Sequence, residues 1–187
     1  KPTLVILAAG MASRYGSMKQ TDGFGPNGET IIEYSIYDAI KAGFGKVVFV
    51  IKEEFAENFK NIFEPKLNGK IETDYVFQTF DLKPFGIDIE IERSKPWGTA
   101  HAVLAARDAV KEPFCVINAD DFYGRESYEK MCDFLKNGVS DTQFSMIGFQ
   151  LDKTLSEHGY VSRGVCEVDE EGNLTEIHER VKVYFKP

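Results

Sequence analysis

The sequence predicts an α/β fold: a doubly wound, mostly parallel sheet with an appended antiparallel portion. Three observations predict it. Near-continuous apolar runs at residues 3–8, 46–51 and 114–119 have the pattern of strands that are covered on both faces. Segments with apolar residues at helical spacing separate these runs, as in parallel sheets with crossover helices. From residue 143 onward the pattern is that of strands alone.

The first predicted helix begins at Ile31, after the first strand. Thr30 and Glu33 have the spacing of a capping box, and Gly43 marks the helix end. After the second strand, apolar residues return at helical spacing. Pro65 is predicted to end this second helix, because proline lacks the N–H that a helix needs.

The middle of the chain continues the alternation of strands and helices. Strands are predicted at 71–77 and 87–91, and an alanine-rich helix, capped by Thr99, is predicted to run to Lys111. A further helix follows the strand 114–119 and ends near Gly138; four residues form its apolar face: Tyr128, Met131, Cys132 and Leu135. The last predicted strands are 143–151, 160–168, 174–178 and 181–185, with a hairpin turn at 170–173.

Length and composition predict an ordinary globular protein. The 187 residues suffice for one core, so we expect a single domain. A net charge of -8 disfavours nucleic acid or an anionic membrane as the partner. Without a spanning apolar run or a signal-peptide pattern, we expect a cytoplasmic protein. Cys115, Cys132 and Cys166 are widely spaced, and we expect buried thiols rather than a disulfide frame or a zinc site.

The loop after the first strand has the composition of a phosphate-binding loop. Leu7-Ala8-Ala9-Gly10 ends the strand in small residues, which let backbone N–H groups approach an oxyanion. Arg14 and Lys19 follow and would supply positive charge for a polyphosphate. The alternative is a polar surface loop with two solvated cations.

Two further stretches fall at the same predicted edge of the sheet, where ligands of such folds bind. Asp120 follows a buried strand, and one carboxylate with phosphate oxygens is a usual Mg²⁺ site. For the neighbouring Asp121, a helix cap and a metal ligand are equally compatible with the sequence. Gly98-Thr99-Ala100 either approaches a base or a phosphate or is a plain helix start.

Several other chemistries lack their motifs in this sequence. His101, His158 and His178 do not have metal-ligand spacing. The sequence contains no Gly-x-Ser-x-Gly elbow, no Walker loop and no Gly-x-Gly-x-x-Gly fingerprint. The last absence argues against a dinucleotide-dependent oxidoreductase.

Taken together, these stretches resemble one family. Leu7 to Gly10, with Ser13-Arg14 and Lys19-Gln20, resembles the signature loop of the sugar-1-phosphate nucleotidylyltransferases, among them the glucose-1-phosphate thymidylyl- and uridylyltransferases. The similarity extends in order along the chain to residues 29–35, Trp97 to Ala102, Asn118-Ala119-Asp120, Gly159-Tyr160-Val161 and Glu176 to Arg180.

The resemblance implies a three-layer fold, a reaction and a set of residues. A nucleoside triphosphate and a sugar-1-phosphate would react with release of pyrophosphate, with Arg14 and Lys19 as catalytic residues and Mg²⁺ on Asp120. It implies that Leu7, Ala8, Ala9, Gly10, Gly98, Thr99 and Ala100 bind the nucleotide, and that Gly159 and Glu179 bind the sugar. The nucleotide part would span about 1–140 and the sugar part about 141–187. The partners would be small molecules rather than nucleic acid or membrane, with homo-oligomerisation left open.

The chain departs from the family pattern in three places. Ala12 stands where the family usually has glycine, and Arg180 replaces a usual lysine. The chain ends at Pro187 before any match to the family's second metal-binding Asp, so we expect either a truncated catalytic core or a shortened relative with weak or no activity. Two alternatives stay open: a non-catalytic nucleotide-sugar sensing domain, and a glycosyltransferase of similar architecture using Asp120-Asp121, which Arg14 and Lys19 disfavour.

Overall fold

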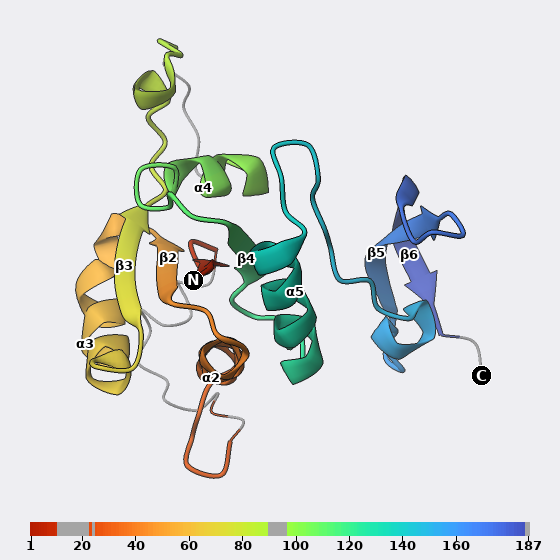
Figure 1. The fold of residues 1–187 in the computed structure, drawn as a ribbon, viewed down its shortest axis with the longest axis horizontal. Coiled ribbons are helices and arrows are strands. Elements are labelled where there is room, and N and C mark those ends of the chain that lie inside the picture. The colour runs from red at the N-terminus through yellow and green to blue at the C-terminus, as the bar shows by residue number, and fades with distance from the viewer. Residues whose placement is uncertain (11–22, 24, 90–96, 186–187) are drawn as a thin grey trace. The chain divides into compact units, whose positions relative to one another are not determined.

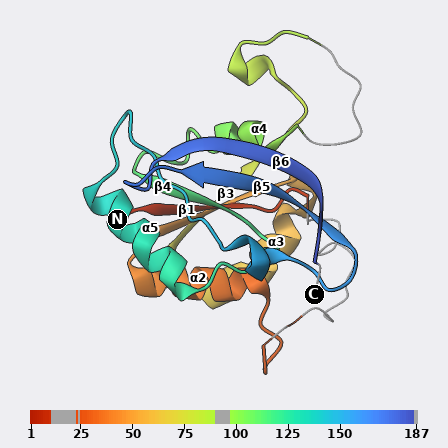
Figure 2. The ribbon, with the colours of Figure 1, turned by 90° about the vertical axis from the view of Figure 1, so that its right-hand side faces the viewer.

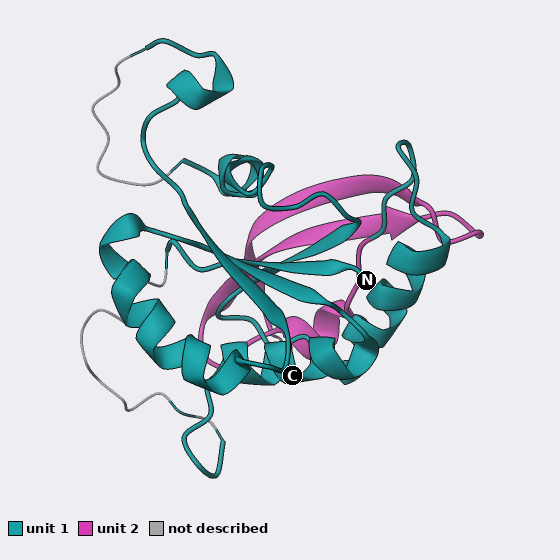
Figure 3. Cartoon of the chain, turned by 60° about the vertical axis from the view of Figure 1, so that its left-hand side comes forward, with its two compact units in different colours: residues 1–145 teal, residues 146–187 magenta. Residues whose placement is uncertain are grey.

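The computed structural model describes residues 1–10, 23, 25–89 and 97–185. These residues form two compact units, residues 1–145 and residues 146–187 (Figure 3). The single-domain organisation stays a prediction.

Unit 1 is built on a parallel sheet with the strand order β3-β2-β1-β4 (Figure 1). Its strands are β1 (Thr3–Leu7), β2 (Lys46–Ile51), β3 (Glu72–Phe77) and β4 (Phe114–Asn118). The chain adds strands to one side of β1 and then returns to add β4 on the other side. The order therefore reverses between β1 and β4, which confirms the predicted doubly wound sheet.

Helices cover both faces of this sheet (Figure 1). On one face lies α4 (Thr99–Ala105); on the other lie α2 (Ile31–Ala42), α3 (Ala56–Leu67) and α5 (Arg125–Asn137). Successive strand residues face opposite sides. Val48 and Val50 therefore pack against Ala102 of α4. Phe49 packs on the other face, against the rings of Phe59 and Phe63 in α3. This burial on both faces explains why β1 and β2 are continuous apolar runs.

The start of α2 forms as its sequence predicts. The Glu33 N–H donates to Thr30 Oγ1 at 3.4 Å, and the Thr30 N–H donates to Glu33 Oε2 at 2.9 Å. The other Glu33 oxygen is 2.6 Å from Lys66 Nζ of α3. Gly43 ends the helix with a φ of 107°, a conformation that favours glycine.

Replacing Thr30 with alanine is expected to lower the free energy of unfolding by about 1 kcal/mol. The substitution removes the hydroxyl that accepts the Glu33 N–H. Urea denaturation of wild type and variant measures the change. Thr142→Ala, at an exposed position, should change the stability by only a few tenths of a kcal/mol; equal losses in both variants would contradict the capping role.

Three helix boundaries differ from the prediction. Pro65 lies inside α3, which continues to Leu67; because Leu67 is buried, its packing offsets the hydrogen bond that proline removes. The alanine-rich helix ends at Ala105, and residues 106–109 form turns with i→i−3 bonds such as Ala109 N–H to the Ala106 carbonyl. Its N-cap is Gly98 rather than Thr99, without a side-chain cap.

Two predicted strands are wrong in the described residues. Residues 87–89 form no strand, and residues 90 and 91 lie outside the described residues. Residues 143–151 form no strand either. Gln143 makes an isolated bridge with Ser140, and Leu151 begins the 3₁₀ turn η3 (Leu151–Thr154). Apolar side chains in both stretches are exposed, Phe144 to 81%. Alternating apolar residues become a strand only where another strand pairs with them.

Unit 2 is an antiparallel ribbon of β5 (Tyr160–Val168) and β6 (Leu174–Tyr184), which lie side by side in Figure 2. The turn at 170–173 forms as predicted; Asp169 Oδ1 accepts the N–H groups of Glu171 and Asn173. The chain makes one strand where two were predicted, because Glu179 and Arg180 stay paired with β5. The appended antiparallel portion is thereby confirmed.

The three cysteines are free thiols. Cys132 is buried and Cys115 is partly buried, but Cys166 is exposed on the two-stranded ribbon, so the prediction of buried thiols is wrong for it. In the part of the chain that the structure describes, every helix is too short or too polar to cross a membrane.

Candidate functional site

A cavity of about 410 Å³ lies where the carboxyl ends of β1 and β4 meet. Its lining comes from the end of β1, the residue after β3, the start of α4 and the end of β4: Leu7, Ala9, Gly10, Gln78, Trp97, Gly98, Thr99, Ala102, Asn118 and Asp120. Leu7 pairs directly with Asn118, and the Ala119 N–H donates to the Leu7 carbonyl at 3.2 Å. This edge is the switch point at which such sheets bind ligands.

The cavity brings together six of the residues that the sequence predicted for nucleotide and metal: Leu7, Ala9, Gly10, Gly98, Thr99 and Asp120. Two other predicted nucleotide residues do not line it. Ala8 is buried, and its N–H donates to the Val50 carbonyl at 2.9 Å. Ala100 is exposed on α4.

The structure does not relate the remaining predicted residues to the cavity. Arg14 and Lys19 lie outside the described residues. Gly159 and Glu179 belong to unit 2, where Gly159 precedes β5 with a φ of 88° and Glu179 is exposed opposite Gly164. Their relation to the cavity stays a prediction.

Two glycines border the cavity without being required by the fold. A Cβ added to Gly10 or Gly98 would meet no described atom within 4 Å, and Gly98 has an ordinary φ of -63°. Gly43 differs, because its φ of 107° favours glycine. Neither backbone conformation nor packing explains Gly98, so the open space beside it fits the close approach of a ligand.

Asp120 and Asp121 are held differently. Asp121 Oδ2 accepts from Asn118 Nδ2 at 2.9 Å and from the Tyr123 hydroxyl at 3.3 Å. Burial raises the pKa of Tyr123 to about 12, so this hydroxyl stays protonated and can donate. Asp121 does not cap α5, whose N-cap is Gly124. Asp120 is exposed, and no described residue hydrogen-bonds or ion-pairs with its carboxylate.

Asp121 therefore fixes the loop after β4, whereas no described residue holds the carboxylate of Asp120. A free carboxylate beside a cavity is a suitable oxygen ligand for Mg²⁺, which uses one or two carboxylates together with substrate phosphates. Asp120 and not Asp121 fits this role.

Gln78 is the main residue of the cavity that the sequence reasoning missed. It is 8% exposed, and its Nε2 lies 2.8 Å from the Trp97 carbonyl oxygen and 3.2 Å from His101 Nδ1. Trp97 is held in turn by its ring N–H, which donates to the Phe80 carbonyl at 3.1 Å. The sequence did carry a signal for Gln78, because it is a polar residue directly after the strand that ends at Phe77.

His101 lies next to Gln78, on the first turn of α4. Its ring lies edge-on to Phe85, with 5.1 Å between the ring centroids. Burial lowers the pKa of His101, which favours the neutral ring. Its Nε2 is buried and has no hydrogen-bond partner among the residues that the structure describes.

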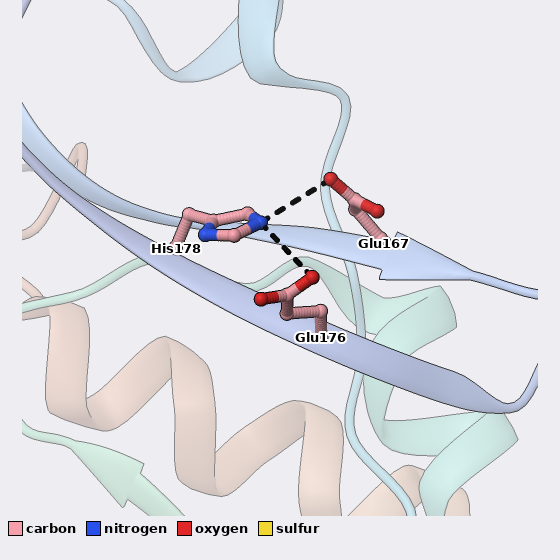
Figure 4. Close-up of side chains that lie close together, drawn as sticks. All are labelled: Glu167, Glu176 and His178. Atoms are coloured by element: carbon pink, nitrogen blue, oxygen red, sulfur yellow. Dashed lines mark ion pairs between the residues drawn. The ribbon is translucent and has the colours of Figure 1, made fainter.

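Unit 2 carries a separate group of metal-ligand side chains, shown in Figure 4: Glu167, Glu176 and His178. His178 Nε2 lies 3.3 Å from a carboxylate oxygen of each glutamate. The group was missed because the strand register, and not sequence spacing, brings it together. Alternation along β6 places His178 and Glu179 on opposite faces of the ribbon. Both glutamates are exposed, and we describe the group as surface ion pairs.

Comparison with known proteins agrees with this geometry. No curated protein matches the chain. The family model described as nucleotidyl transferase matches residues 4–182 and thus includes every described segment that lines the cavity. The chain belongs to the nucleotidyl transferase family.

Proposed function

We propose that the protein joins a nucleoside triphosphate to a sugar-1-phosphate, or to a similar phosphorylated acceptor, with release of pyrophosphate. One observation carries the proposal: a cavity at the switch point of the sheet gathers six predicted nucleotide and metal residues, and no described residue pairs with its Asp120 carboxylate. The family match supports nucleotidyl transfer in general.

The reaction needs positioning and charge neutralisation rather than a covalent nucleophile. A phosphate oxygen of the acceptor attacks the α-phosphorus of the triphosphate in line. The bond between the α-phosphorus and its bridging oxygen breaks, and this oxygen leaves with pyrophosphate. Arg14 is proposed to neutralise the β- and γ-phosphates, and Lys19 to bridge the transferring phosphoryl group and the acceptor phosphate.

The remaining roles follow from the cavity and from the resemblance. Backbone groups at Ala9, Gly10 and Gly98 would hold the nucleotide, and Gly159 and Glu179 would bind the acceptor sugar. Asp120 would hold Mg²⁺, which when bound supplies positive charge to the α-phosphate and the leaving group.

The test is an assay with each nucleoside triphosphate, a panel of sugar-1-phosphates and Mg²⁺. Release of pyrophosphate, dependent on both substrates, is the expected result. Nucleotide binding without turnover would indicate a sensing domain instead, and transfer of sugar from a nucleotide sugar would indicate a glycosyltransferase.

Replacing Gly98 with valine is expected to weaken nucleotide binding by at least about tenfold. The new side chain would occupy the space beside the cavity, and its Cβ would meet no described atom within 4 Å. Calorimetric titration measures the dissociation constant, and thermal unfolding checks that stability is kept. Gly148→Val is the matched control, because Gly148 also has open space but lies outside the cavity lining. Unchanged binding by Gly98→Val would contradict the placement of the nucleotide.

A further inference from the structure

We propose that Glu167, Glu176 and His178 bind a divalent transition metal ion, with Zn²⁺ as its representative, and that this ion ties the two strands of the unit 2 ribbon together. In the metal-free chain the three side chains form the surface ion pairs described above. None of the three residues lines the cavity, so this inference does not depend on the proposed function.

The strand pairing holds the three side chains on one face of the ribbon (Figure 4). Glu167 of β5 lies directly opposite Glu176 of β6, and His178 follows two residues later on the same face. The ligand atoms of the three side chains all lie within 4.8 Å of one another. The backbone hydrogen bonds of the ribbon therefore place the group, and the chain need not rearrange to form it.

The distances around His178 fit a bound metal ion. Its Nε2 lies 3.3 Å from Glu167 Oε1 and 3.3 Å from Glu176 Oε2. Bonds of about 2.0–2.1 Å to a tetrahedral Zn²⁺ place neighbouring ligand atoms about 3.3–3.4 Å apart. An ion can therefore occupy the space between the nitrogen and the two oxygens after small side-chain adjustments. Because both glutamates are exposed, a fourth position stays open to water.

The donor set selects the class of ion. An imidazole nitrogen with two carboxylates suits Zn²⁺ and its neighbours in the transition series, whereas Mg²⁺ and Ca²⁺ prefer oxygen ligands alone. His178 would bind such an ion through a bare Nε2, with the ring proton on Nδ1. The group thus differs in chemistry from Asp120, which offers a carboxylate beside the cavity.

Two features of the ribbon indicate what the ion would do there. The carboxylates of Glu167 and Glu176 face each other across the strands, and like charges in this position destabilise a sheet. A two-stranded ribbon is also only marginally stable by itself. A cation bound to both strands removes the repulsion and closes the hairpin beside the register shift between Glu167 and Val168.

The test titrates ZnCl₂ into the full chain in excess Mg²⁺, which fills sites made of oxygen ligands alone. Calorimetric titration of the wild-type chain is expected to show one zinc ion per chain. His178→Gln and Glu176→Gln should each weaken this binding by at least about tenfold, because each removes a metal ligand. Far-ultraviolet circular dichroism checks that both variants keep the fold.

Hydrogen exchange locates the bound ion. At a zinc concentration ten times the dissociation constant, the amide hydrogens of β5 and β6 should exchange about tenfold more slowly, because the ion binds only the closed ribbon. The amide hydrogens of unit 1 should keep their exchange rates. In His178→Gln the same zinc concentration should leave the exchange of β5 and β6 close to that of the metal-free chain.

Three control variants remove other metal-binding groups of unit 2. Cys166→Ser removes a thiol that adjoins Glu167 in the sequence but lies on the opposite face of the ribbon. Glu170→Gln removes an exposed carboxylate in the turn of the same hairpin, and His158→Gln removes an exposed histidine before β5. All three should bind zinc as tightly as the wild type does.

Two results would overturn the proposal. If the wild-type chain binds no zinc, or if His178→Gln binds it unchanged, the three side chains are ion pairs and nothing more. If zinc binding is lost in Cys166→Ser, the thiol is a ligand and the assigned site is wrong. Neither result bears on pyrophosphate release, which tests the proposed function separately.

Discussion

Asp120→Asn is expected to slow pyrophosphate release by about a hundred- to a thousandfold. The amide keeps the size of the side chain but removes the negative charge that would hold Mg²⁺ beside the phosphates. Initial rates measured over a range of Mg²⁺ concentrations test this, because weakened metal binding raises the concentration needed for half-maximal rate.

The neighbouring carboxylate supplies a demanding control. Asp121→Asn disturbs the hydrogen bonds with Asn118 and Tyr123, so its expected effect is on stability, with a rate within about tenfold of wild type. Asp108→Asn, at an exposed position outside the cavity, should change neither quantity. If Asp120→Asn released pyrophosphate at the wild-type rate at low Mg²⁺ concentration, the proposal that Asp120 holds the metal would be wrong.

Arg14→Ala is expected to abolish measurable pyrophosphate release while nucleotide binding survives. The guanidinium would stabilise charge that develops on the leaving pyrophosphate, and loss of one such group costs about a hundred- to a thousandfold in rate. Backbone contacts to the nucleotide are unaffected by the change. Pyrophosphate release and calorimetric nucleotide binding, measured on the same preparation, test the two halves of the expectation.

Arg125→Ala is the matched control, since this arginine pairs with Glu129 on α5 and is exposed. It should keep the wild-type rate. Full activity in Arg14→Ala would contradict the proposed role of the loop. Loss of nucleotide binding together with loss of rate would indicate that Arg14 acts in ground-state binding rather than in catalysis.

The parts of unit 1 that could be predicted carry strong local signals. A capping box and a terminal glycine define α2. Buried apolar runs define β1 and β2, because strands covered on both faces need apolar residues at nearly every position. Placing the cavity needed one more step, the rule that parallel strands end at a common edge. Leu7, Gly98 and Asp120 could therefore be grouped from the sequence.

The errors arise where structure depends on distant partners. Ile87, Ile89 and Phe144 pair with no strand among the described residues, which no local pattern reveals. Pro65 is tolerated because Leu67 packs in the core beyond it. Gln78 escaped notice because its importance comes from Trp97 and His101, which only the fold brings to it.

The position of β4 beside β1 has a consequence for synthesis of the chain. β1 can pair with β2 early, but Leu7 meets Asn118 only after the intervening strands and helices have been made. Such long-range parallel pairing is slow, because the chain must close a large loop before the new contacts stabilise it. A nascent chain that stalls before β4 would thus carry much of the hydrophobic core but only part of the cavity wall. Ligands added during refolding should then favour the last assembly step and leave the earlier ones unchanged.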